Sequence, residues 1–306
     1  SLSDVDSIGA GIGIYCAAKV LGKKAQIVVN EPTSSVRPMI ACFTEEKGYP
    51  SDLFINSEAA MEMVGRNTLV MVVDTNRPDQ VECGPLLEAI PRVCVVDHHR
   101  RAADYIKPVV VNLHEPYASS AAELVTELLE YGVEKADVLP IEAKSLMAGI
   151  FLDTKSFNVR TGQRTFEAAA TLRQWGADTV EVKKLLQNDF QDTMAKYQII
   201  KSARLYRKEI AVAALNTGTT RVLAAQAADE MLGIDGVNAS FVLFNAGDVI
   251  NISARSFGAV NVQLIMETLG GGGHLTMAAA QLSDCTMDDA VRRLAAAIDK
   301  YREEQR

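Results

Sequence analysis

The segment Val93–Arg100, Val-Cys-Val-Val-Asp-His-His-Arg, constrains the fold of this 306-residue chain more than any other. Its four apolar residues favour a strand that is buried on both faces, as in parallel sheets. Asp97, His98 and His99 follow this strand directly, and they include two of the chain's four histidines. Open α/β sheets bind ligands at the carboxyl ends of their strands. We therefore expect a mostly parallel sheet with polar groups at one edge.

Further carboxylates stand next to other predicted elements. They are Asp4 and Asp6 before the first helix, Asp74 after strand 69–73, and Asp153 after the apolar run 149–152. We interpret that last run as a further strand end, although Asp153 also falls between two predicted helices. Carboxylates and an imidazole from separate elements predict a site for hard divalent cations, with two ions as the favoured number.

Each of these residues also has an ordinary structural interpretation. Asp74 could be a turn residue or a helix cap. Paired carboxylates at a helix start often only favour the helix dipole, and histidines are more often surface or hydrogen-bonded residues than metal ligands. The metal interpretation is favoured because the same pattern, an apolar run that ends in aspartate, recurs.

Composition limits the class of protein. The chain is 48% hydrophobic and 23% charged, as expected for a soluble protein of one or two domains. Its net charge of −8 argues against binding to duplex or non-specific nucleic acid, whereas bound cations would still admit an anionic substrate. We expect neither a membrane span nor a signal peptide. Five scattered cysteines indicate a reducing compartment, so the expected location is cytoplasmic.

The order of predicted elements divides the chain. Strands and helices alternate over residues 1–188, which predicts an α/β domain with helices on both faces of its sheet. A polar helical stretch near 190–207 is interpreted as the main part of a linker over 189–207. Residues 208–306 are expected to form a smaller α/β domain that includes a hairpin turn at 246–248.

Two glycine-rich segments have different interpretations. Gly9–Gly13 has the spacing G-x-G-x-G, which differs from the G-x-G-x-x-G of dinucleotide-binding sites, so close helix packing is favoured. Gly270–Gly273 precedes His274 and follows Arg255 in the chain. Free backbone amides beside these two side chains predict an anion-binding site. The alternative is a flexible linker, but apolar structured sequence flanks the segment on both sides.

Taken in this order, the motifs resemble the DHH phosphoesterase superfamily, in which a catalytic DHH domain precedes a DHH-associated substrate domain. The resemblance covers essentially the whole chain. Within the superfamily, four segments are similar to the GdpP (YybT) type of cyclic-di-AMP phosphodiesterase: residues 4–10, 72–78, 96–101 and 149–157.

This resemblance implies two metal sites, with Mn²⁺ as the usual ion. The first would be formed by Asp4, Asp74 and a histidine four residues before Asp4, and the second by Asp6, Asp74, His98 and Asp153. That histidine would stand immediately before Ser1, so we expect the native sequence to extend upstream. The alternative is a protein that lacks this ligand, which would be a catalytically impaired nucleotide-binding module.

The resemblance also implies the remaining site residues. His99 would face the scissile phosphate, and Asp97 would orient its neighbours. The substrate's phosphates would be held across an interdomain cleft by three groups: Arg255, His274 and the backbone amides of Gly271, Gly272 and Gly273.

The implied function is hydrolysis of cyclic-di-AMP to the linear dinucleotide pApA by a water activated between two metal ions. A second branch of the superfamily, the nanoRNases that also hydrolyse pAp, is the main alternative. An inorganic pyrophosphatase is disfavoured because the second domain has no dense cluster of lysine and arginine. The chain would be the catalytic portion of a larger membrane-anchored protein, without membrane contact of its own. Linear dinucleotides remain candidate substrates, and the choice between a monomer and a homodimer is left open.

Overall fold

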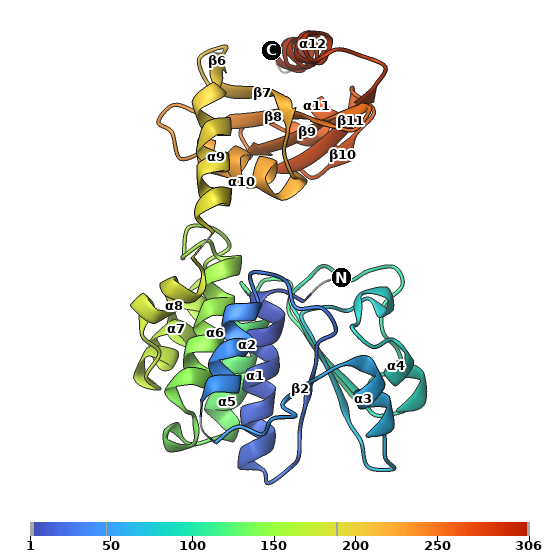
Figure 1. The fold of residues 1–306 in the computed structure, drawn as a ribbon, viewed down its shortest axis with the longest axis vertical. Coiled ribbons are helices and arrows are strands. Elements are labelled where there is room, and N and C mark those ends of the chain that lie inside the picture. Colours follow the sequence, from blue (N-terminus) through green and yellow to red (C-terminus); the bar gives the residue numbers. More distant parts are fainter. Residues whose placement is uncertain (1–2, 47, 188, 305–306) are drawn as a thin grey trace. The chain divides into compact units, whose positions relative to one another are not determined.

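A computed structural model describes residues 3–46, 48–187 and 189–304, and the chain divides into two compact units, residues 1–187 and 188–306 (Figure 1). The helices of the first unit are α1 (Val5–Val20), α2 (Arg37–Glu45), α3 (Ser57–Glu62), α4 (Pro85–Ala89), α5 (Ala121–Gly132), α6 (Pro140–Asp153), α7 (Gln163–Gln174) and α8 (Thr179–Leu185). Its strands are β1 (Ile27–Val28), β2 (Phe54–Ile55), β3 (Val70–Val73), β4 (Val93–Asp97) and β5 (Val111–His114).

The sheet of the first unit confirms the predicted parallel arrangement. Strands β3, β4 and β5 lie side by side in that order, and β1 pairs with β2 in a separate parallel pair. All five residues of β4 are buried, and the two faces of the strand pack in different apolar clusters. Val93 and Val95 belong to the apolar cluster that includes Leu87 of α4, whereas Val96 joins the main core with α1, α5 and α6.

Small residues in α1 allow it to pack closely against its neighbours. A Cβ atom at Gly9 would lie 2.5 Å from the carbonyl oxygen of Ser145 in α6, and one at Gly13 would lie 2.5 Å from a methyl carbon of Val125 in α5. The packing interpretation of these glycines is confirmed. Because α1 begins at Val5, this close packing also fixes the carboxylates at its start.

The second unit is built on a six-stranded sheet with the order β10-β11-β9-β8-β7-β6. Its strands are β6 (Arg204–Tyr206), β7 (Ile210–Gly218), β8 (Ala239–Ala246), β9 (Val249–Ser256), β10 (Gly272–Gly273) and β11 (Met277–Ser283). Its helices are α9 (Phe190–Ser202), α10 (Arg221–Met231), α11 (Val262–Glu267) and α12 (Met287–Glu304). Phe241 and Leu243 pack in the apolar cluster with α11 and α12, whereas Val242 and Phe244 pack in the cluster with α9 and α10. The predicted turn between β8 and β9 is confirmed, with Gly247 at a φ of 65°.

Two expectations about local structure were wrong. Asp153 is the last residue of helix α6 and does not follow a strand. The helix expected over 190–207 ends at Ser202, and its last part forms strand β6. Helix α9 packs on α10 and β7 within the second unit. Within the described part of the chain, no helix is both long and apolar enough to span a bilayer.

The contact between α1 and α6 gives a test of this packing. We expect Gly9→Ala to lower the free energy of unfolding by about 1–3 kcal/mol, because the added methyl meets a backbone oxygen that cannot move independently of its helix. Gly11→Ala is the matched control in the same helix, since the nearest atom to its Cβ would be an Ile27 side-chain carbon at an ordinary 3.5 Å. This control should be stabilising by up to about 1 kcal/mol through helix propensity. Urea unfolding of the two variants measures the difference, and equal stabilities would contradict the packing argument.

Candidate metal centre

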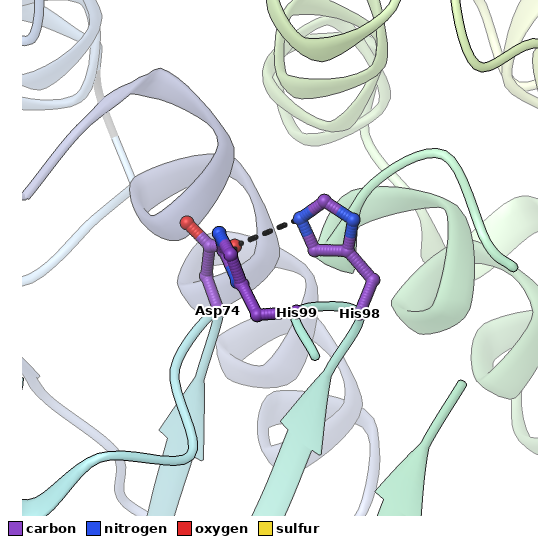
Figure 2. A group of neighbouring side chains, drawn as sticks. All are labelled: Asp74, His98 and His99. Atoms are coloured by element: carbon purple, nitrogen blue, oxygen red, sulfur yellow. Dashed lines mark ion pairs between the residues drawn. The ribbon is translucent and has the colours of Figure 1, made fainter. Parts of the chain in front are cut away.

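The candidate centre lies at the carboxyl ends of β3 and β4. Asp74 follows β3 with a φ of 62°, an uncommon conformation for a residue with a side chain, and its N–H donates to the carbonyl of Val96 at 2.9 Å. His98 and His99 follow β4 directly. Figure 2 shows both imidazoles beside the Asp74 carboxylate. The two strand ends that the sequence singled out are therefore neighbours in space.

His98 is at the centre of the cluster. Its Nε2 lies 3.3 Å from Asp74 Oδ1, 3.2 Å from Asp153 Oδ2 and 3.9 Å from Asp6 Oδ2. Two groups of side chains have ligand atoms close enough together to hold an ion: Asp6, His98 and Asp153, and Asp74, His98 and His99. Of the five residues nominated as metal ligands, four are thus brought together.

Asp6 is fully buried and is held by the start of another helix. Its carboxylate accepts hydrogen bonds from the N–H groups of Ala121 and Ala122, at 2.7 and 2.9 Å. These are the first two residues of α5, so the positive end of that helix dipole faces the carboxylate. Helix α6 leaves room for Asp6 through Gly149, where a Cβ atom would lie 2.6 Å from Asp6 Oδ1.

Asp4, the fifth nominated ligand, stands outside both groups. Its Oδ1 accepts a hydrogen bond from the N–H of Ser7 and caps α1, which is the ordinary role of such a residue. Its negative charge nevertheless contributes to raising the pKa of Asp6 and of Asp74. Asp4 is therefore electrostatically part of the same cluster.

The carboxylates of the cluster are buried close together, and both burial and their mutual repulsion raise their pKa values. Burial raises the pKa of Asp74 to about 6, against the opposing effect of His98. Burial also raises the pKa of Asp6 well above its usual value, and the charges of Asp74 and Asp153 raise it further. For His98, burial lowers the pKa, but the contacts with Asp153 and Asp74 and the charge of Asp6 outweigh it and raise the pKa to about 10. A proton on His98 is thus the cluster's own source of positive charge.

Two atoms of the cluster indicate that a cation fits there. Asp74 Oδ1 and His98 Nε2 are buried, and neither has a hydrogen-bond partner among the residues that the structure describes. Although they lie 3.3 Å apart, the contact does not have hydrogen-bond geometry. Buried polar atoms without partners are rare and call for a ligand or ion. Carboxylate and imidazole donors together suit a divalent ion such as Mn²⁺.

His99 is oriented by a second set of side chains. Its Nδ1 lies 2.9 Å from Asp97 Oδ1, which also accepts the backbone N–H of His99. This hydrogen bond raises the pKa of His99, against burial, which lowers it. Asn76 donates to Asp97 Oδ2, and His114 lies within 2.6 Å of the His99 carbonyl oxygen. Neither Asn76 nor His114 was predicted as a site residue. Asn76 lies two residues after Asp74 and His114 ends β5, but the contacts that they make depend on how the strands pair.

In the second unit, the nominated residues come together at one end of the sheet. Arg255 in β9 pairs in register with Met277 in β11, and Met277 is hydrogen-bonded to His274 through the backbone. Arg255 Nε lies 3.2 Å from Asp229 Oδ1, and Arg255 Nη1 donates to the carbonyl of Ala254.

The three glycine amides nominated as anion ligands are not equivalent. The N–H of Gly271 donates to the carbonyl of Met266 at 2.9 Å. His274 and Met277 form a hydrogen-bonded pair of the antiparallel ladder, so by alternation Gly272 is the next hydrogen-bonded residue, and the N–H of Gly273 points to the open edge. A Cβ at Gly271 or Gly273 would lie 2.1 or 2.4 Å from a backbone oxygen. Gly273 is therefore the strongest of the three as a donor to a ligand.

Comparison with known proteins identifies the class. Residues 2–150 match the model of the DHH family, N-terminal domain, and residues 207–304 match that of the DHHA1 domain. The chain belongs to the DHH family, and the predicted resemblance is confirmed. A solved structure of an exopolyphosphatase-related protein from Bacteroides fragilis has the same fold, with a TM-score of 0.77 at 19% identity over 98% of this chain and 89% of that one.

Two curated relatives are more similar in sequence. The chain is 46% identical to "Cyclic-di-AMP phosphodiesterase GdpP" of Bacillus subtilis over 307 residues and 43% identical to "Cyclic-di-AMP phosphodiesterase PdeA" of Listeria monocytogenes over 305. Each comparison covers 97% of this chain and 46% of the relative. The chain therefore spans about half the length of the curated relatives it matches. The predicted similarity to the GdpP type is confirmed.

The raised pKa of His98 predicts how divalent ions affect stability at different pH values. Without such ions, the stability contributed by protonated His98 is fully present below its unfolded pKa of 6.5 and is lost as pH rises through its folded value of about 10. A cation that replaces this proton should stabilise the protein more at higher pH, by about 1.4 kcal/mol per pH unit for one proton. We expect the difference in Tm between Mn²⁺ and EDTA to increase from pH 6.5 to 8.5.

The control for this measurement is His98→Gln, which removes the titrating group. Its Tm difference should depend much less on pH. A Tm difference that stays constant or falls with pH in the wild type would contradict the placement of the ion at His98.

Gly149 offers a second test of the same centre. Gly149→Ala would press a methyl group against the Asp6 carboxylate, which the α5 amides hold in place, so we expect Mn²⁺ affinity to fall by about 10-fold or more. Gly132→Ala is the control and should leave the affinity unchanged, since in the described part of the chain no atom lies within 4 Å of the Cβ position of this α5 glycine. Calorimetric titration with Mn²⁺ measures both, and equal affinities would show that Asp6 is not a ligand.

Proposed function

We propose that this chain is a metal-dependent hydrolase that opens cyclic-di-AMP to pApA. The observation that supports this most is the convergence of Asp6, Asp74, His98 and Asp153 around buried atoms that have no hydrogen-bond partner among the described residues. The similarity to two cyclic-di-AMP phosphodiesterases over 97% of the chain supports the choice of substrate.

Two divalent ions, with Mn²⁺ as the expected metal, would be held by the carboxylates and His98. Asp4 and Asp74 would contact one, and Asp6, Asp74, His98 and Asp153 the other, with Asp74 shared between them. When bound, such ions would supply positive charge to the phosphate oxygens and lower the pKa of the attacking water.

His99 is proposed as the residue that faces the scissile phosphate. Because Asp97 Oδ1 accepts from its Nδ1–H, the other ring nitrogen, Nε2, is directed away from Asp97. The hydrogen bond to Asp97 raises the pKa of His99, so a larger fraction of the ring is protonated at neutral pH. A protonated Nε2 can stabilise charge on the phosphate or donate a proton to the leaving oxygen.

The reaction balances as a simple hydrolysis. The oxygen of water forms a bond to phosphorus, the bond between phosphorus and one ribose 3′ oxygen breaks, and that oxygen takes up a proton. Opening one phosphodiester of the ring leaves a linear dinucleotide with a 5′ phosphate, which is pApA.

The second unit is proposed to bind substrate phosphate through Arg255, His274 and the backbone amides of Gly271–Gly273. Arg255 supplies a partly buried guanidinium, which suits a phosphate oxygen. Among the three amides, the edge position of the Gly273 N–H supports it most.

The test is hydrolysis of cyclic-di-AMP by the full-length protein with Mn²⁺, run beside pAp, pGpG and a short RNA. We expect selective opening of cyclic-di-AMP. Asp74→Asn should reduce kcat/KM by about 1,000-fold or more, which corresponds to about 4 kcal/mol of transition-state stabilisation. Asparagine tolerates the left-handed backbone at this position, so the fold should be retained.

Asp79→Asn is the matched control, since Asp79 is an exposed aspartate five residues away that pairs with Arg77 on the surface. It should leave kcat/KM unchanged. A preference for pAp or short RNA would favour the nanoRNase alternative, and tight nucleotide binding without turnover would favour a binding module.

A further inference from the structure

The turn Asp97–Arg100, here called the DHH turn, is held from both neighbouring strands. From the end of β3, the Asn76 side chain donates to Asp97 Oδ2 and to the carbonyl of Arg100. From β5, the His114 side chain reaches the carbonyl of His99. The turn therefore receives two hydrogen bonds from the Asn76 side chain and one from His114, in addition to its internal bonds to Asp97.

The contact made by His114 is well defined. Its Nε2 lies 2.6 Å from the carbonyl oxygen of His99, and because a carbonyl only accepts, Nε2 must carry the proton. The same atom is 3.8 Å from Asp97 Oδ2, which is beyond hydrogen-bond distance. The backbone that carries the His114 side chain is itself held in place. Asp97 pairs in register with His114, and the N–H of Glu115 donates to the Asp97 carbonyl at 3.0 Å.

The position of the His99 carbonyl matters because two adjacent residues, His98 and His99, must direct their side chains into different environments. The His98 side chain is 2% exposed and lies within the metal-ligand cluster, whereas the His99 side chain is 52% exposed. Asp97 holds the ring of His99 at Nδ1, but a ring hydrogen bond alone leaves the peptide that follows His99 free to rotate. The contact from His114 acts on that peptide.

We propose that His114 is a positioning residue that fixes the His99 backbone so that the Nε2 of His99 is presented to the scissile phosphate. This inference rests on the proposed role of His99 and adds to it a residue that acts without touching the substrate. This positioning requires a hydrogen-bond donor at the same distance from the backbone of residue 114 as the imidazole Nε2. The amide nitrogen of glutamine lies about as far from Cα as the imidazole Nε2 does. Asparagine is one methylene shorter than glutamine, and phenylalanine fills the space without a hydrogen-bond donor.

The experiment compares these three replacements. His114→Phe and His114→Asn should lower kcat for cyclic-di-AMP by about 10- to 100-fold, the usual effect of losing a supporting hydrogen bond at such a site, with KM and the Mn²⁺ requirement little changed. His114→Gln should restore most of the rate. Asn112→Ala, an exposed position on the same strand, is the control and should behave as wild type.

A second readout does not depend on the substrate. In ¹⁵N-histidine NMR spectra, the Nδ1 proton of His99, bonded to Asp97, should be protected from exchange in the wild type and in His114→Gln but lost in His114→Phe and His114→Asn. If the wild type did not hydrolyse cyclic-di-AMP, the proposed function would be wrong. The NMR spectrum would still test whether His114 positions His99.

The inference is overturned if His114→Asn and His114→Phe keep the wild-type kcat and the protected His99 signal. It is also overturned if kcat, Mn²⁺ affinity and Tm fall together in all three replacements, glutamine included, because that pattern indicates a residue needed only for folding.

Discussion

The convergence of carboxylates on His98 is the interaction that the rest of the first unit depends on. Charges taken out of water and placed side by side are unfavourable unless positive groups meet them. Here they are met by the amides that begin α5 and by a proton on the His98 imidazole, which a divalent ion would replace. The fold places these charged groups next to one another. Glycines allow α1, α5 and α6 to approach closely, and that approach brings Asp6 and Asp153 to the ends of β3 and β4.

Several non-glycine residues with a positive φ lie close in sequence to the ligands of this cluster. Asp74 has a positive φ, and so do Lys155, Ser156 and Phe157, which follow Asp153 in succession. Non-glycine residues adopt this conformation only where surrounding contacts over-determine it. After Asp153 those contacts include the bond from the N–H of Ser156 to the Phe151 carbonyl and that from the N–H of Phe157 to Thr154 Oγ1. Asp74 and the segment after Asp153 are thus held by the surrounding structure in backbone conformations that isolated peptides rarely adopt.

Much of the fold and of the centre could be predicted from the sequence because periodicity and element ends are local. Four apolar residues before Asp97 were sufficient to predict β4. Asp153 was placed at a strand end because Gly-Ile-Phe-Leu is apolar without a helical period visible over so short a run. Strand β11 was not predicted since its Ala-Ala-Ala favours helix, and only pairing with β9 makes it a strand. The roles of Asn76 and His114 depend on sheet register, which is a property of tertiary structure.

The geometry of the glycine run in the second unit limits where a side chain can be introduced. Gly271 and Gly273 are required by the backbone of β11, which lies too close for any side chain. Gly270 has a φ of 78°, which disfavours other residues. Gly272 differs from all three, because no atom of the described residues lies within 4 Å of its Cβ position and its φ is also outside the left-handed region. Gly272 is therefore the position of this run at which a side chain can be introduced without a backbone clash or a strained φ.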